Sequence, residues 1–175
     1  MTEDLAKRVL REVVGMLLVA FLLAIFLTQN VFFIAEINGS SMSPTLEDGD
    51  RCIAVCLHGE KREHPDYGIY FAYSEVLDEN ICKRVIGVEG DTLKFIDGNL
   101  FRNGEEIEEP YVMFIDYYQG TFVIPAGKVF LAGDNRAKSL DSRLWDDPFV
   151  DVKDLRGKAV FQVSPLWKIR SLKEV

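Results

Sequence analysis

The sequence predicts a mainly β protein, with a single N-terminal transmembrane helix followed by an antiparallel β-sheet or barrel-like domain. Two observations lead to this fold class. The stretch 13–35 carries no charged residue, and the rest of the chain consists of short apolar runs separated by turn signals. With 175 residues, 48% hydrophobic and 27% charged, the chain is long enough for one folded domain and is unlike a disordered protein.

The uncharged stretch 13–35 is long enough to cross a bilayer. As a helix it would span about 34 Å at roughly 1.5 Å per residue, against a hydrocarbon core of about 30 Å. Lys7, Arg8 and Arg11 precede it, and the positive-inside rule then places the N-terminus in the cytoplasm. We expect a single-pass protein of the cell membrane, with a cytoplasmic N-terminus (1–12), a transmembrane signal-anchor helix (13–35) and an extracytoplasmic domain (36–175).

Two other interpretations of this segment remain open. A cleavable signal peptide would fit 15–28, but the apolar stretch continues to Ala35 and no convincing small-x-small cleavage site follows. A buried helix of a soluble domain normally has a polar face, which this segment lacks.

The domain after residue 36 reads as a series of strands and turns. The dipeptides Asp97-Gly98 and Asn103-Gly104 predict tight hairpins. A helical turn is plausible only around 141–155, where Pro148 interrupts it. The expected strands are 51–56, 67–73, 81–88, 92–96, 121–125, 128–133 and 157–163.

Charge and cysteine content exclude several kinds of function. The net charge of −8 argues against a nucleic-acid partner, which would need a basic face. Cys52 and Cys56 lie too far apart along one strand for an unstrained disulfide, so with Cys82 they are expected to be small core residues. His58 and His64 are the only histidines, and no zinc-type spacing exists. We expect no metal and no cofactor.

Three polar stretches could carry catalysis, and the first is "GSSMSPTL" at 39–46. A serine nucleophile needs a base, and both histidines lie in a charged, loop-like stretch. A lysine can act as the base if burial lowers its pKa. The second stretch, "ENICKRVIGVEGD" at 79–91, contains such a candidate. Lys83 lies there in the alternation Ile81, Lys83, Val85 of an apolar strand, although a charge on an edge strand is the plainer interpretation.

The third stretch is "GDNRAKSLDSR" at 133–143, which follows an apolar strand. It is either a solvated loop with an Asp141–Arg143 ion pair or a buried polar scaffold in which a hydroxyl holds the lysine amine. Alone, none of the three stretches identifies an enzyme.

In this order behind one anchor, the three stretches resemble bacterial type I signal peptidases, in the compact form typical of Gram-positive bacteria. The family pattern has a Ser-Met-x-Pro-Thr-Leu box, matched at 41–46, and a Lys-Arg-x-x-Gly-x-x-Gly-Asp strand, matched at 83–91. Its third box, Gly-Asp-Asn-Arg-x-x-Ser-x-Asp-Ser-Arg, is matched at 133–143. The resemblance extends from the anchor to about Phe161.

The resemblance implies a role for each matched residue. Ser41 would be the nucleophile, with its backbone N–H in the oxyanion hole, and Lys83 the general base. Ser139 would orient the Lys83 amine, and Asp141 and Arg143 would form a supporting ion pair. Gly39 stands where some members carry a second hydroxyl donor. The positions implied to bind substrate are Ile37, Gly39, Met42, Leu46, Ile81 and Cys82.

The same resemblance implies the activity and the partners. The family removes N-terminal signal peptides from exported preproteins, cutting after small-x-small motifs in a peptide bound as an added strand. We expect signal peptides, the lipid bilayer and the secretion translocase as partners. Trp145 and Trp167 would lie either at the lipid interface or in the core.

Other members of the wider Ser-Lys class remain alternatives. Self-cleaving repressor domains share the Ser-Met-x-Pro turn but are cytosolic, and a mitochondrial inner-membrane peptidase has closely similar boxes. An alternative from another class is a catalytically silent homologue that assists assembly of exported or pilus proteins. Such a protein would be expected to have lost Ser41 or Lys83, and both are present.

Overall fold

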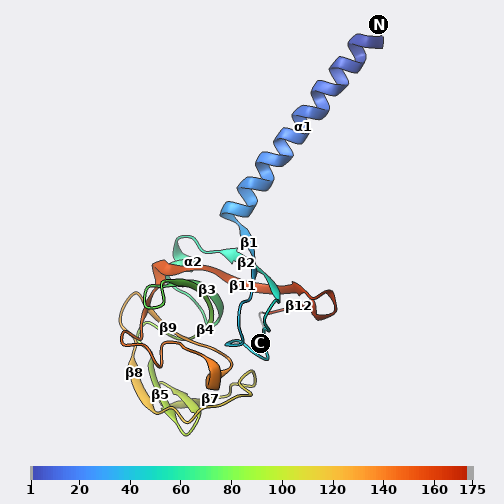
Figure 1. Ribbon diagram of the computed structural model, residues 1–175. Helices are drawn as coiled ribbons and strands as arrows, with labels where there is room; N and C mark the ends of the chain where they lie inside the picture. Colours follow the sequence, from blue (N-terminus) through green and yellow to red (C-terminus); the bar gives the residue numbers. More distant parts are fainter. Residues whose placement is uncertain (1, 173–175) are drawn as a thin grey trace.

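The computed structural model describes residues 2–172, and it consists of one long helix that projects from a β domain (Figure 1). The helices are α1 (Thr2–Asn30) and α2 (Glu60–Glu63), with 3-10 turns η1 (Arg136–Lys138), η2 (Val152–Asp154) and η3 (Leu166–Lys168). The strands are β1 (Phe32–Glu36), β2 (Arg51–Cys56), β3 (Gly68–Ser74), β4 (Glu79–Val88), β5 (Thr92–Ile96), β6 (Asn99–Arg102), β7 (Glu105–Ile107), β8 (Gly120–Val123), β9 (Lys128–Ala132), β10 (Val150–Asp151), β11 (Leu155–Ser164) and β12 (Arg170–Ser171). The predicted fold class and all seven expected strands are confirmed.

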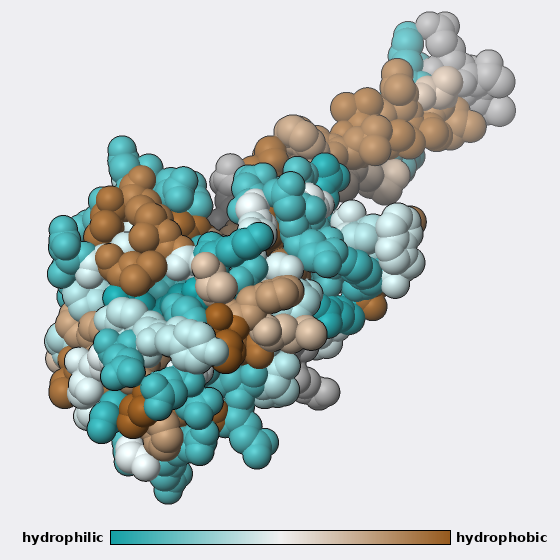
Figure 2. Space-filling model, turned by 60° about the horizontal axis from the view of Figure 1, so that its bottom comes forward, coloured by the Kyte–Doolittle hydropathy of each residue, from teal (hydrophilic) through white to brown (hydrophobic). Residues whose placement is uncertain are grey.

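Helix α1 is apolar and solvent-exposed along most of its length (Figure 2). Its part from Asp4 to Thr28 is long and apolar enough to cross a membrane. The helix ends at Asn30, five residues before the expected boundary at Ala35. The last four residues of the apolar stretch, 32–35, form β1 together with Glu36 instead.

Strand β1 could not be predicted from the sequence, because its residues continue the apolar run of the helix without a break in the hydrophobic pattern. The structure separates it by pairing: Phe32–Glu36 forms an antiparallel ladder with β2. Phe33 and Ala35 pack toward the core, and Ile34, which points away, is 63% exposed. Backbone pairing with the domain therefore ends the anchor before its apolar residues end.

The larger sheet has the order β1-β2-β11-β3-β4-β9-β10, with β12 paired to β11. Two of its edges are open in the described part of the chain. Strand β1 pairs on one side only, and β9 pairs with β4 only from Arg84 onward. The first half of β4, residues 79–83, therefore has a strand partner, β3, on one side alone.

The smaller sheet, in the order β7-β6-β5-β8, contains both predicted hairpins. Asp97 and Gly98 have φ values of 50° and 87°, and Asn103 and Gly104 have 56° and 90°. Two successive left-handed residues form the turn type that matches strand twist, and Asn, Asp and Gly adopt it most easily. Both hairpin predictions are confirmed.

The structure shows which tryptophans and cysteines are buried in the core. Trp145 is 8% exposed and packs in the core, so the core alternative holds for it, whereas Trp167 is 85% exposed. Cys52 is buried, and Cys56 and Cys82 are half-buried. All three are free thiols.

The expected helical turn around 141–155 is present only as the 3-10 turn η2 at Val152–Asp154. The rest of that stretch consists of bends, turns and the short strand β10 at Val150–Asp151. Hydrogen bonds from side chains to the backbone determine the conformation at its start. The Asp141 carboxylate accepts from both the backbone N–H and the side chain of Arg143. The short helix α2 was missed, because four residues are too few to show a helical period.

Candidate active site

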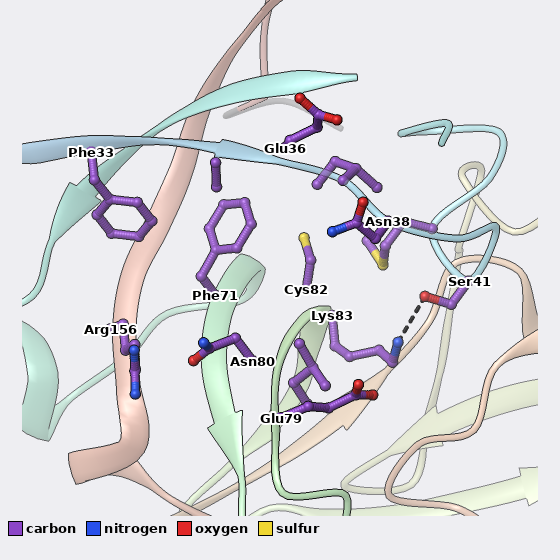
Figure 3. Close-up of a pocket in the computed structure, with 14 residues that line it drawn as sticks. Phe33, Glu36, Asn38, Ser41, Phe71, Glu79, Asn80, Cys82, Lys83 and Arg156 are labelled. Carbon is purple, nitrogen blue, oxygen red and sulfur yellow. Dashed lines mark hydrogen bonds between the residues drawn. The ribbon is translucent and has the colours of Figure 1, made fainter. Parts of the chain in front are cut away.

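Ser41 and Lys83 meet although 42 residues separate them. Ser41 lies in the turn that follows β1, and Lys83 lies in β4. The Lys83 Nζ is 2.7 Å from the Ser41 Oγ, within hydrogen-bonding distance (Figure 3). The side chains are thus arranged as a nucleophile and its base would be.

The environment of Lys83 favours its neutral form. The residue is 7% exposed and forms no ion pair with any described carboxylate. Burial lowers the pKa of the Lys83 amine, because an ammonium loses hydration that the apolar surroundings do not replace. The nearby Asp141, Cys82 and Glu79 oppose this effect and raise its pKa by a smaller amount.

The loop 133–143 holds the backbone around Ser41. The Asn135 N–H donates to the Ser41 carbonyl at 3.0 Å, and the Asn135 side-chain amide donates to the Ser40 carbonyl at 3.1 Å. Gly133 packs so closely that a Cβ added there would lie 2.4 Å from the Ser41 carbonyl oxygen. These contacts fix the position of the serine relative to the loop.

Asp141 and Arg143 form a fully buried ion pair within the same loop. The Arg143 Nε and Nη2 donate to the two Asp141 carboxylate oxygens at 2.8 and 2.9 Å. The same carboxylate accepts from the Gly133 N–H at 2.9 Å. Arg143 also donates to the Arg136 carbonyl and to Asp116. The pair therefore ties both ends of the loop together.

A second buried ion pair, which was not predicted from the sequence, joins this loop to β4. Arg84, adjacent to Lys83 but on the opposite face, donates to both carboxylate oxygens of Asp134 at 2.8 and 2.7 Å. Thr45, in the turn after Ser41, donates to the same carboxylate at 2.6 Å. Asp134 thus connects the serine turn, the lysine strand and the loop. The available signal was an arginine in an apolar strand.

Ser139 is buried beside these groups, but its bonding differs from the expected arrangement. It is 4% exposed, and its hydroxyl has no hydrogen-bond partner in the described part of the chain. A Cβ at Gly133 would lie 2.3 Å from the Ser139 Oγ. The hydroxyl therefore lies against Gly133 next to the Ser41 carbonyl, with no bond to the Lys83 amine.

A groove of about 370 Å³ leads away from Ser41 and Lys83 (Figure 3). It lies between the two open sheet edges, since its walls come from residues 33–38 on one side and 79–83 on the other. Four of the expected substrate-binding residues line it, namely Ile37, Met42, Ile81 and Cys82. Burial raises the pKa of the Cys82 thiol, which keeps it protonated.

The other two expected substrate-binding residues do not line this groove. Leu46 is fully buried in the core behind Met42. Gly39 has a φ of 89°, a conformation that suits glycine, and its N–H donates to the Asp48 carboxylate at 2.7 Å. The groove also exposes charged side chains that the sequence did not single out, namely Glu36, Glu79 and Arg156.

Comparison of the chain with known proteins identifies its family. The family model described as signal peptidase, peptidase S26, matches residues 10–164. Signal peptidase IB of Staphylococcus aureus is 33% identical over 178 residues, covering 91% of this chain and 92% of the relative. A probable signal peptidase I-1 of Synechocystis is 34% identical over 169 residues, covering 89% and 83%.

A crystal structure of a signal peptidase I from Enterococcus faecalis matches with a TM-score of 0.49 and 27% identity, covering 54% of this chain and 96% of that chain. The family model alone spans most of the chain and includes all three sequence boxes. The chain belongs to the signal peptidase family, peptidase S26.

Proposed function

We propose that Ser41 and Lys83 are the nucleophile and the general base with which this protein removes signal peptides. The activity itself follows from the family: the chain is a serine endopeptidase that cleaves N-terminal signal peptides from preproteins. The observation that carries the assignment is the 2.7 Å approach of a buried lysine amine to the Ser41 hydroxyl. In water a lysine is protonated at neutral pH, and burial of Lys83 acts against that protonation by lowering its pKa.

The reaction then proceeds in two acyl-transfer steps. Neutral Lys83 takes the proton of the Ser41 hydroxyl as its oxygen attacks the scissile carbonyl, and the resulting ammonium gives that proton to the leaving amine. A water molecule, deprotonated by the same lysine, hydrolyses the ester. The developing oxyanion needs donors, and the Ser41 backbone N–H has no other partner among the described residues.

The 133–143 loop supports the dyad in this proposal. The buried Asp141–Arg143 pair fixes the loop, and Asn135 and Gly133 fix the backbone of Ser41. Ser139 has a buried hydroxyl without a partner among the described residues in the same loop, and a hydroxyl oxygen can accept a hydrogen bond from an amine. We therefore keep Ser139 as a positioning residue for the amine.

The signal peptide binds as an added strand. The open edge of β4 at 79–83 and that of β1 are the two walls of the groove, so an extended peptide between them would pair with backbone on both sides. Ile37, Met42, Ile81 and Cys82 line the groove together with Ser41. Apolar walls at this place suit short apolar side chains of a substrate, which supports cleavage after small-x-small motifs.

Cleavage of a preprotein by the full chain in detergent tests this assignment. A preprotein with alanine at the first and third positions before the cut should be processed at that bond. Replacing either alanine by leucine should reduce kcat/KM at least about 100-fold, because a large side chain cannot enter a well-packed pocket without moving it. Equal cleavage of all three substrates would contradict the proposed pockets.

A pH profile tests the lysine. Activity should rise with pH as the Lys83 ammonium loses its proton. The Glu79 carboxylate raises the pKa of Lys83, so Glu79→Gln should lower that pKa and move the rise in activity to lower pH. Glu36→Gln is the matched control, since Glu36 lines the groove but is paired with Arg51. A shift to higher pH in Glu79→Gln, or an equal shift in both variants, would argue against Lys83 as the titrating base.

Helix α1 supports a membrane anchor, and we propose that it spans the bilayer once. Its basic N-terminal turns favour a cytoplasmic N-terminus and an extracytoplasmic domain. The exposed Leu166, Trp167 and Ile169 in the loop before β12 suit contact with lipid, and a secretion translocase must deliver the preprotein to this side. Protease added to sealed right-side-out vesicles should digest the domain, and a protected domain would overturn this topology.

The alternative of a catalytically silent assembly factor has no support in the site. Burying the Lys83 amine against the Ser41 hydroxyl is unfavourable, because the charged form of the amine loses its hydration. A protein without catalytic activity would have no need for this arrangement.

A further inference from the structure

The groove has a second end, away from Ser41, whose lining differs from that of the part beside Ser41. Phe33, Phe71, Asn80 and Arg156 gather there, from four different strands (Figure 3). We call these four residues the distal subsite. The Phe33 and Phe71 rings meet edge to face, with centroids 5.6 Å apart. The distal subsite is therefore an aromatic floor with two polar side chains at its border.

The backbone around Arg156 is built to direct this side chain into the groove. Leu155 pairs with Ala72 and Gly157 pairs with Phe71, so Arg156 is an extra residue, a β-bulge, opposite β3. Bulges change the direction of a side chain and are frequent beside active sites. Here the bulge turns the guanidinium toward the same hollow that Phe71 lines.

Gly157 completes this arrangement. A Cβ at this position would lie 2.6 Å from the Phe33 ring and 2.9 Å from the Val55 carbonyl oxygen. Only glycine leaves room for the ring, which can then lie across β11 and stack its edge on Phe71. The bulge, the glycine and the ring pair thus shape one site.

Arg156 has a charge that no described carboxylate of the protein pairs with. It is exposed and forms no ion pair with any described carboxylate; its one charge contact is the Tyr73 ring, with the guanidinium carbon 5.7 Å from the centroid. Arg84, Arg136 and Arg143 each bind a carboxylate in two places or more. Glu36, the acid nearest to Phe33 in sequence, is paired with Arg51 at 3.0 Å.

We propose that the distal subsite selects the signal peptide by binding an acidic or amide side chain through Arg156. Asn80 and Lys83 are three residues apart on β4, which is about 10 Å along a strand. A peptide cut at Ser41 therefore reaches Arg156 with about the fourth or fifth residue before the scissile bond. This inference rests on the proposed function, because it assumes the strand-like binding described above.

The chemistry of the site favours an acceptor side chain. A guanidinium presents several N–H donors in a plane and pairs with carboxylates and amide oxygens, and an aromatic floor excludes water from one side of that pair. A lysine at the same substrate position would meet like charge. The plainer interpretation is that the Arg156 stem only covers apolar surface with its charge in water. In that case the charge of the substrate residue would not matter.

The test uses one preprotein, with a small-x-small cut, that carries Glu, Gln or Lys at the fourth and, in a second set, at the fifth position before the bond. The full chain in detergent should give kcat/KM in the order Glu, Gln, Lys at one of the two positions. The difference between Glu and Lys should be about two- to fivefold, the range that exposed ion pairs produce. Arg156→Glu should reverse the order, and Arg156→Gln should remove it.

Lys94→Glu is the matched control. It makes the same change of net charge from an exposed position on β5, outside the groove, and should keep the wild-type order. Reversal in both variants would show a general charge effect and overturn the proposal, as would cleavage that is equal for Glu, Gln and Lys at both positions. If the wild-type protein cleaves none of the preproteins, the proposed function fails rather than the subsite.

Discussion

We expect Ser41→Ala and Lys83→Met each to lower kcat/KM for preprotein cleavage by at least about 1,000-fold, since general-base and nucleophilic catalysis each contribute on this scale. Ser41→Ala removes the attacking oxygen. Lys83→Met keeps the length and the apolar packing of the side chain but removes the amine that lies 2.7 Å from Ser41. Because the two residues act as one unit, the double variant should lose no more activity than either single variant.

Folding should survive both substitutions, which separates catalysis from stability. Lys83 is buried without an ion pair, so replacing it by methionine removes a group whose charged form is unfavourable there. Thermal unfolding should therefore occur at the same temperature or higher. Ser43→Ala and Lys94→Met serve as controls with full activity. Substantial cleavage by Lys83→Met at neutral pH would show that another group is the base.

The sequence predicted seven of the twelve described strands, because each of those seven carries its own local signal. Apolar runs end at Gly, Pro, Asn or Asp, and the hairpins at Asp97 and Asn103 need only two residues to specify their turn. The end of the anchor had no such signal. From Val31 to Ala35 the sequence is equally suited to a helix and to a buried strand, and only the long-range ladder with β2 decides between them.

The site was predictable as a set of residues but not as an arrangement. Neither Ser41 nor Lys83 stood out from the residue pattern alone, and the resemblance of three boxes brought them together. What no local pattern contains are contacts across 50 to 95 residues, such as Arg84 with Asp134 and Asn135 with Ser40. Such contacts depend on the fold, so they could be found only in the structure.

The buried Asp141–Arg143 ion pair explains how burial can lower the pKa of Lys83 although an aspartate lies nearby. A bare carboxylate near Lys83 would stabilise the ammonium and raise its pKa. Asp141 does act in this direction, but its charge is compensated by the two-point bond to Arg143. The loop can therefore use acids as structural acceptors while burial dominates the pKa of the base.

Gly133→Ala should lower kcat by about 100-fold, the loss that follows when a reacting group is displaced by about 1 Å. Gly133 does not have a left-handed φ, so alanine causes no backbone strain there. The added methyl carbon would instead lie 2.4 Å from the Ser41 carbonyl oxygen and 2.3 Å from the Ser139 hydroxyl. One of these must move, and Ser41 is held to the same loop through Asn135.

Steady-state kinetics and thermal unfolding of two variants separate displacement from general destabilisation. Gly87→Ala is the matched control, because its Cβ would meet the Ile124 and Leu93 side chains in the core, remote from the groove. Overpacking of this kind costs about 1–3 kcal/mol of stability. We expect both variants to unfold at lower temperature but only Gly133→Ala to lose kcat, with KM nearly unchanged because the groove walls stay in place. Equal loss of kcat in both variants would mean that Gly133 supports folding and not the position of Ser41.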